Sequence, residues 1–237
     1  AHGHTTDVIL VTGRMRPIDR DHLVRTVLLP RAGAGRDRSD GERPLVVVAT
    51  QCIEAGADLD FDALVTECAS LDALKQRFGR LDRRGELQRT SSVILGRSDL
   101  TAEGAEDPIY GLALSSTWQW LNTCGNTIAV DFGIDALPTP LDSAGALRTD
   151  LVAPAADAPV LLPAHLDAWA QTSQRPSPDP DVGLWLHGPK KAVSDVQIVW
   201  RLGAAYGEED EQSLIERLDA CRPSSLEAVT VPLGAAR

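Results

Sequence analysis

Four short apolar runs in the first hundred residues constrain the fold of this 237-residue chain. They contain many β-branched residues, show little alternation of polar and apolar positions, and end at polar residues or glycine. Strands that are buried on both faces have this pattern. The runs are "DVILVTG" (7–13), "PLVVVAT" (44–50), "DALVTEC" (62–68) and "SSVILG" (91–96).

Two stretches between these runs are helical in pattern. In "IDRDHLVRTVLL" (18–29), Asp19 is the expected N-cap, and in "SLDALKQRFGRL" (70–81) it is Ser70. The second stretch carries one apolar stripe, formed by Leu71, Leu74, Phe78 and Leu81. Strands that alternate with helices predict an α/β fold, in which a parallel sheet is flanked by helices. The polar stretch 31–44 is expected to be a loop.

The regular alternation of strand and helix patterns ends after Leu100, so we expect one domain over residues 1–100 and a smaller mixed α+β region over 101–237. In that region Trp118 and Leu121 are the expected core residues of the first helix. The expected segments are a helix over 107–121, a Pro/Asp-rich linker over 173–181, a hairpin of 182–188 with 195–201, and an acidic helix over 208–220.

Charge divides the chain at the same place. Residues 1–100 carry 15 basic and 15 acidic residues, and the rest carry 8 and 19, for a net charge of −11. Net charge governs solubility and long-range steering, so it does not exclude a local anion site. No apolar run approaches the roughly 20 residues that cross a bilayer, and we expect a cytoplasmic protein. The four scattered cysteines suggest buried thiols rather than a zinc site or disulfides.

The segment "QRFGRLDRRG" (76–85) concentrates positive charge in this acidic chain. If it is helical, Arg77, Arg80 and Arg84 recur at three- and four-residue spacing on one face. A solvated face is the ordinary explanation, but such faces usually interleave more acidic residues than the two present here. The alternative is a phosphate site. Gly79 costs about 1 kcal/mol in a helix relative to alanine, which suggests a close backbone approach.

Polar residues also follow the first two predicted strands. Because ligands bind outside the carboxyl ends of parallel strands, we expect these residues to meet the arginine segment at one edge of the sheet. After the first strand come Thr12, Gly13 and Arg14; after the second come Thr50, Gln51, Glu54, Gly56 and Asp58.

The blocks A-T-x-x-x-E-x-G-x-D (49–58) and Q-R-x-G-R-x-x-R (76–83) together resemble motifs V and VI of the second RecA-like lobe of superfamily 2 helicases. The resemblance implies that Arg80 and Arg83 are arginine fingers for a bound ATP, and that Gln76 and Arg77 help couple the two lobes. It further implies that Gly56 and Asp58 contact the nucleotide.

The block "VTGRMRPIDRD" (11–21) resembles motif IV of the CRISPR-associated helicase-nuclease of type I systems, and the later segments resemble the region beyond its helicase core. This resemblance implies that Gly13, Arg14 and Thr50 contact single-stranded DNA, and that the partner is a CRISPR surveillance complex. Another superfamily 2 helicase or restriction translocase, or a non-catalytic DNA-binding or scaffold lobe, remains an alternative.

The chain lacks the G-x-x-x-x-G-K-[ST] loop and the D-E-x-H box of that family. The resemblance therefore places the ATP phosphates and Mg on an N-terminal helicase lobe outside this sequence, and no metal ligand is expected within it. We expect a fragment that is inactive alone, and that lacks the first strand and helix of its own lobe.

Overall fold

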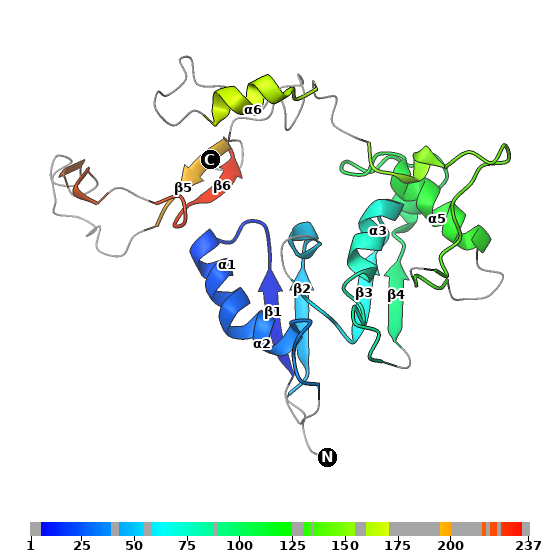
Figure 1. Ribbon diagram of the computed structural model, residues 1–237, viewed down its shortest axis with the longest axis horizontal. Helices are drawn as coiled ribbons and strands as arrows, with labels where there is room; N and C mark the ends of the chain where they lie inside the picture. The colour runs from blue at the N-terminus through cyan, green and yellow to red at the C-terminus, as the bar shows by residue number, and fades with distance from the viewer. Residues whose placement is uncertain are drawn as a thin grey trace. The chain divides into compact units, whose positions relative to one another are not determined.

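The computed structural model describes residues 6–38, 43–54, 58–87, 90–124, 130–133, 135–154, 160–170, 195–200, 215–216, 219–221 and 224–233. Two compact units divide the chain. One comprises residues 1–153 with 198–229, and the other comprises 154–197 with 230–237. The described parts confirm an α/β class built on small parallel sheets (Figure 1).

All four predicted strands form, one or two residues shorter than expected at their ends. Strand β1 (Asp7–Val11) pairs in parallel with β2 (Leu45–Ala49), and β3 (Ala63–Glu67) pairs in parallel with β4 (Ser91–Leu95). The single expected sheet is instead two separate two-stranded sheets in the described residues. Each pair is joined by a helical crossover.

The crossover from β1 to β2 is one helical run. It consists of α1 (Pro17–Leu23), a π-helical segment (Val24–Leu28) and α2 (Leu29–Ala32). The predicted N-cap, Asp19, was wrong: Arg16 is the N-cap, because Pro17 supplies a fixed φ at the first helical position. The Asp19 carboxylate binds the Arg16 guanidinium instead, at 2.5 and 2.8 Å.

Helix α3 (Leu71–Phe78) connects β3 to β4. Ser70 is its N-cap residue as predicted, although its side chain makes no capping hydrogen bond. The predicted apolar stripe packs into the core, where Leu71, Leu74 and Phe78 are buried and Leu81 lies against them. The helix was expected to reach residue 81 and ends three residues earlier.

Helix α5 (Ala113–Cys124) packs on α3 and completes this core. Its buried tryptophan is Trp120 rather than the predicted Trp118, while Leu121 is buried as expected. Trp118 is half-buried and lies against Gly96, where a Cβ atom would come within 2.7 Å of its ring. Helix α4 (Ser98–Thr101) precedes α5.

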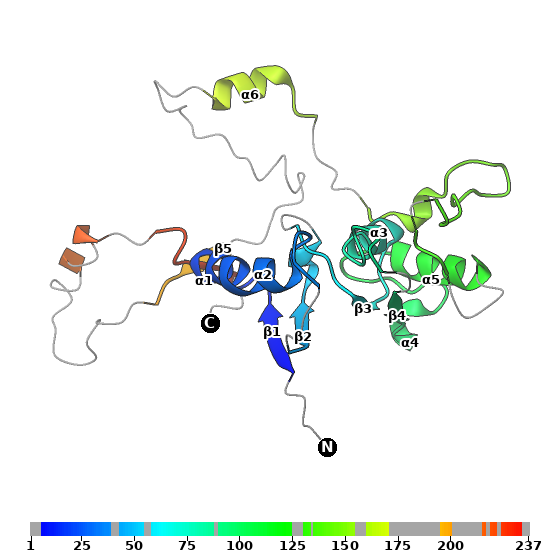
Figure 2. The same cartoon turned by 60° about the horizontal axis from the view of Figure 1, so that its bottom comes forward.

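Two hydrophobic clusters hold the β-α-β units. Val11, Leu28, Ala32 and Leu59 form the core of the first unit, and residues of α3 and α5 with Leu151 form that of the second. Figure 2 shows α1, α2 and α3 lying over the same side of their strands. The helices therefore cover one face of the two sheets.

The rest of the described chain contains a 3-10 turn (Thr149–Leu151), α6 (Pro163–Trp169), β5 (Asp195–Ile198) and β6 (Val229–Pro232). Strand β5 lies within the predicted run 195–201 but pairs with β6. Its expected partner, 182–188, and the linker over 173–181 lie outside the described residues, as does most of 208–220. No helix in the described parts combines the length and apolarity that a membrane span requires.

Candidate functional site

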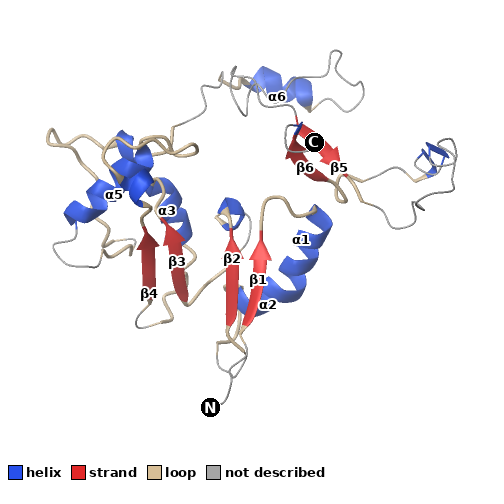
Figure 3. Cartoon of the chain, turned by 180° about the vertical axis from the view of Figure 1, so that it is seen from behind, coloured by secondary structure: helices blue, strands red, loops and turns tan. Residues whose placement is uncertain are grey.

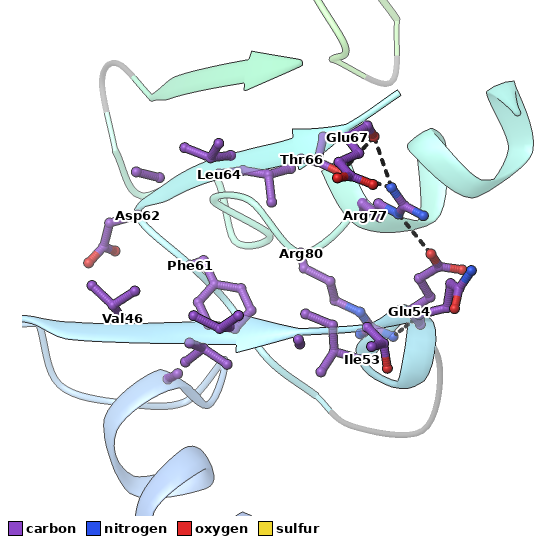
Figure 4. Close-up of a pocket in the computed structure, with 18 of the residues that line it drawn as sticks. Val46, Ile53, Glu54, Phe61, Asp62, Leu64, Thr66, Glu67, Arg77 and Arg80 are labelled. Carbon is purple, nitrogen blue, oxygen red and sulfur yellow. Dashed lines mark hydrogen bonds and ion pairs between the residues drawn. The ribbon is translucent and has the colours of Figure 1, made fainter. Parts of the chain in front are cut away.

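The last turn of α3 is tied to the carboxyl ends of β2 and β3 by one side chain, Arg77. Its Nε donates to Glu54 Oε1 at 2.7 Å, and its Nη1 donates to Thr66 Oγ1 at 2.8 Å and to the carbonyl of Glu67 at 3.0 Å (Figure 4). Its Nη2 donates to the Tyr110 hydroxyl at 2.8 Å. Both partners of the Arg77–Glu54 ion pair are largely buried. Arg77 thus fixes the segment that follows β2 against α3.

The remaining arginines lie on a turn that leaves the helix. The backbone N–H of Phe61 donates to the Arg80 carbonyl at 2.7 Å, and that of Asp82 donates to the Phe61 carbonyl at 2.9 Å. These bonds give Leu81 an isolated parallel bridge to Phe61. Asp82 then adopts a positive φ of 43° and its carboxylate accepts from the backbone N–H of Glu86. Tertiary pairing therefore ends the helix.

This turn corrects the expected helical arginine face. Of Arg77, Arg80 and Arg84, only Arg77 lies in α3, so the three do not share one face. The reason expected for Gly79 was also wrong: a Cβ there would meet only carbonyls of the preceding turn, the nearest being that of Lys75 at 3.2 Å. Gly79 is the C-cap residue of the helix.

Arg80 lies beside the segment that follows β2 (Figure 4). Its Nη2 donates to the backbone carbonyl of Glu54 at 2.9 Å, while its Nε is buried without a hydrogen-bond partner in the described structure. A buried guanidinium nitrogen without an acceptor is costly, so it favours the approach of an acceptor oxygen. Arg80 therefore has donor capacity that the described residues leave unused.

Asp60 anchors the arginine turn from beneath. It is 1% exposed, accepts a hydrogen bond from the backbone N–H of Arg83 at 2.8 Å and pairs with Arg38 Nη2 at 2.6 Å. Burial alone lowers the pKa of Arg38, but the hydrogen bond and charge of Asp60 outweigh it and leave that pKa raised. Asp60 was not predicted, although "DLDFD" (58–62), an alternating acidic segment beside a strand, was a signal for it.

The Arg83 side chain is exposed, and its Nε lies 3.1 Å from Asp58 Oδ1. Asp58 is exposed as well, whereas the predicted neighbour Gly56 lies outside the described residues. The structure therefore brings Arg83 and Asp58 together at one rim. The exposed side chain of Gln76 lies one residue before Arg77 on α3.

The predicted DNA-contacting residues follow β1 and β2. Since Val11 pairs with Ala49 in the parallel register, Gly13, Arg14 and Thr50 emerge at the same edge. The backbone N–H of Thr50 donates to the Val11 carbonyl at 3.2 Å. All three predicted residues are exposed, and a Cβ at Gly13 would meet nothing within 4 Å. This edge is open to a ligand.

Cys68 ends the third predicted strand run and is buried, and burial raises the pKa of its thiol to about 11. Cys52 and Cys124 are half-buried, whereas Cys221 is exposed, so the expectation of buried thiols was wrong for Cys221. Across the described residues, no group of three or more His, Cys, Asp or Glu side chains is arranged to hold a metal ion.

The other aromatic candidates do not join this site. Trp169 and His165 stack on each other in α6 with ring centroids 6.4 Å apart, and Trp200, expected in a core, is exposed. Trp185 and His187 lie outside the described residues. Tyr110, which no sequence pattern indicated, does contact this site: its hydroxyl accepts hydrogen bonds from Arg77 Nη2 and from Gln51 Nε2.

Comparison with known proteins gives this geometry a context. Residues 1–86 match the family model described as "CRISPR-associated nuclease/helicase Cas3, C-terminal". A Cas3 nuclease/helicase of Methanothermobacter thermautotrophicus is 44% identical over 61 residues, which are 26% of this chain and 7% of that protein. A Cas3 endonuclease/helicase of Thermus thermophilus is 42% identical over 127 residues, which are 49% of this chain and 13% of that protein.

Solved structures match more loosely. The crystal structure of T. fusca Cas3 is 25% identical, with a TM-score of 0.44 over 52% of this chain and 15% of that one. TM-scores below 0.5 do not establish a shared fold. The family model and the curated relatives confirm the predicted resemblance: the chain is similar to the C-terminal region of Cas3 helicase-nucleases. It spans 7% and 13% of the length of the two curated relatives described above.

Proposed function

We propose that this chain is the C-terminal part of an ATP-dependent DNA helicase of CRISPR interference, and that it supplies one half of the ATP site and part of the DNA track. The observation that carries the proposal is the turn Arg80–Arg83, whose backbone is held by Asp60 and Phe61 just before β3. From this turn the Arg80 side chain reaches the segment that follows β2. A rigid backbone with available guanidinium donors is what a group that reaches the phosphates of a neighbouring lobe requires.

In this proposal Arg80 and Arg83 are the arginine fingers. The planar guanidinium matches the charge that spreads over phosphoryl oxygens in the transition state. Asp58, beside Arg83, contacts the ribose, and Gly56 leaves room for the nucleotide. Gln76 couples the lobes through its exposed side chain. Arg77 helps couple the lobes indirectly, by holding the segment after β2 in place, because at least four hydrogen bonds already engage its donors within the chain.

The DNA track is the edge formed by Gly13, Arg14 and Thr50, where single-stranded DNA passes across the ends of β1 and β2. A cation, a hydroxyl and exposed backbone are the groups that contact phosphates without reading sequence. ATP and its Mg are held mainly by the N-terminal lobe of the longer protein, and a CRISPR surveillance complex recruits that protein. By itself, the 237-residue chain neither hydrolyses ATP nor unwinds DNA.

Single substitutions in the full-length protein test the fingers. We expect Arg80→Ala and Arg83→Ala each to lower DNA-stimulated ATP hydrolysis by about 10³-fold or more while the affinity for DNA changes little. Arg84→Ala is the matched control, since Arg84 is an exposed neighbour that pairs with Glu86. Wild-type turnover in either finger variant, or an equal loss in the control, contradicts the assignment.

The DNA track has its own test. Arg14→Ala should weaken single-stranded DNA binding and reduce the dependence of log K on log salt by about one phosphate contact. The control is Arg25→Ala, an exposed arginine of the helical crossover. An unchanged salt slope for Arg14→Ala refutes the track. If Arg14→Ala loses DNA binding while Arg80→Ala and Arg83→Ala keep wild-type ATP hydrolysis, the results would instead favour a non-catalytic DNA-binding lobe.

A further inference from the structure

One tyrosine hydroxyl joins two segments of the proposed site. The Tyr110 oxygen accepts a hydrogen bond from Arg77 Nη2 at 2.8 Å and another from Gln51 Nε2 at 3.2 Å. A hydroxyl oxygen has two lone pairs, so these two bonds occupy its capacity as an acceptor. Gln51 comes from the segment after β2, and Arg77 comes from the last turn of α3. The hydroxyl therefore sets the separation of the two side chains.

The turn that carries Tyr110 is held by its own hydrogen bonds. Asp107 Oδ1 accepts from the backbone N–H groups of Ile109 and Tyr110, each at 2.8 Å. The backbones of Asp107 and Gly111 exchange two hydrogen bonds, at 3.0 and 2.9 Å, and the positive φ of Gly111, 56°, closes the turn. The half-buried Tyr110 ring packs against the core of the β3–β4 unit. The fold, rather than the two partners, thus places the hydroxyl.

The same core holds one partner of the hydroxyl and not the other. Helix α5 follows the turn and lies beside α3, as Figure 3 shows from behind, and the buried residues of the two helices form one cluster. Tyr110 and Arg77 therefore belong to one packed body. Gln51 instead follows β2, and no strand pairing joins β2 to β3 in the part of the chain that the structure describes. The hydroxyl consequently ties the end of one sheet to the body of the other.

Each partner of the hydroxyl also adjoins a residue of the proposed function. Gln51 directly follows Thr50, the proposed DNA contact. Arg77 lies three residues before Arg80, a proposed finger, and its carbonyl accepts the backbone N–H of Arg80 at 3.0 Å. A DNA phosphate that fixes Thr50 would fix Gln51 with it, and through the hydroxyl would restrain Arg77. The contacts thus run without a break from the DNA track to the finger.

We propose that Tyr110 is a positioning residue that couples DNA binding at Thr50 to the ATP-directed side chain of Arg80. It touches neither ligand, and acts by holding Gln51 and Arg77 at one separation. This role rests on the proposed function, since it needs both a DNA contact and a finger. It brings a residue from beyond the predicted helicase domain, 1–100, into the stimulation of ATP hydrolysis by DNA.

Tyr110→Phe in the longer protein removes the hydroxyl and keeps the ring. The readout is the ratio of the ATP hydrolysis rate at saturating single-stranded DNA to the rate without DNA. We expect this ratio to fall about 10-fold, as for the loss of a hydrogen bond to a charged group. The control is Ile109→Ala, which alters a 63% exposed neighbour on the same turn and should keep the wild-type ratio. An unchanged ratio in Tyr110→Phe overturns the role, and equal falls in both rates give that result, as a residue that only stabilises the fold would.

A double-mutant cycle with Gln51→Ala tests whether the two hydrogen bonds act together. If one hydroxyl links Gln51 to Arg77, Gln51→Ala lowers the ratio as well, and Tyr110→Phe adds little further loss in its presence. Losses that multiply independently overturn the role. A wild-type protein whose ATP hydrolysis DNA does not stimulate overturns the proposed function together with this role, whereas wild-type stimulation that survives Tyr110→Phe overturns this role alone.

Discussion

Replacing Asp60 by asparagine should destabilise the arginine turn more than any neighbouring carboxylate substitution. The change keeps the shape of the side chain and an oxygen that can accept from the Arg83 N–H, but it removes the charge that pairs with Arg38. Breaking a buried ion pair costs about 3–5 kcal/mol. Arg38 is 17% exposed and retains Asp62 at 3.1 Å. We therefore expect a loss of about 2–3 kcal/mol in the free energy of unfolding.

The matched control is Asp62→Asn. Asp62 also pairs with Arg38, but its side chain is 63% exposed, and exposed ion pairs contribute about 0–1 kcal/mol. Urea unfolding followed by tryptophan fluorescence measures both variants, and the difference between them isolates the effect of burial. A loss for Asp60→Asn below about 1 kcal/mol, or equal losses in the two variants, refutes the reasoning that Asp60 anchors the turn.

Two further substitutions test the packing of the β3–β4 unit. Gly96→Ala should lower the free energy of unfolding by about 1–3 kcal/mol, because its Cβ would lie 2.7 Å from the Trp118 ring. The control Gly35→Ala, where a Cβ meets nothing within 4 Å, should change that free energy little. Equal shifts in the melting temperature of the two variants would contradict this contact. Iodoacetamide at pH 8 should label Cys221 and spare Cys68, whose thiol is buried with its pKa raised to about 11. The Cys68 thiol pKa in the folded protein exceeds the unfolded value near 9, so its contribution to stability is complete below pH 9 and is lost towards pH 11. Cys68→Ala should therefore reduce the fall in unfolding free energy between pH 9 and pH 11. Fast labelling of Cys68 in the native protein refutes both expectations.

The strands and the buried stripe of α3 could be predicted because the sequence encodes them locally. A run such as "PLVVVAT" (44–50) is β-branched and bounded by polar residues, and the spacing of Leu71, Leu74 and Phe78 admits one buried helical face. These signals need no knowledge of distant residues. The parallel class followed from them, because helices separate the strands.

The arginine turn could not be predicted in the same way. Local spacing favoured a helix through residue 81, and what ends it is hydrogen bonding to Phe61, nearly twenty residues earlier in the chain. The role of Asp60 has the same origin, since its partner Arg38 comes from the segment after α2. Arg77 likewise finds Tyr110 from a distant turn. The residue pattern selected these arginines as candidates, which stays a prediction, and it gave no access to their tertiary partners.

The contacts of these arginines also link the two sheets. In the described residues no strand ladder joins β2 to β3. The Arg77–Glu54 ion pair and the hydrogen bond from Arg80 Nη2 to the Glu54 carbonyl connect the segment after β2 to α3 and to the turn after it. The position of the arginine turn relative to β2 therefore depends on side-chain contacts, whose geometry varies more than the fixed spacing of paired strands.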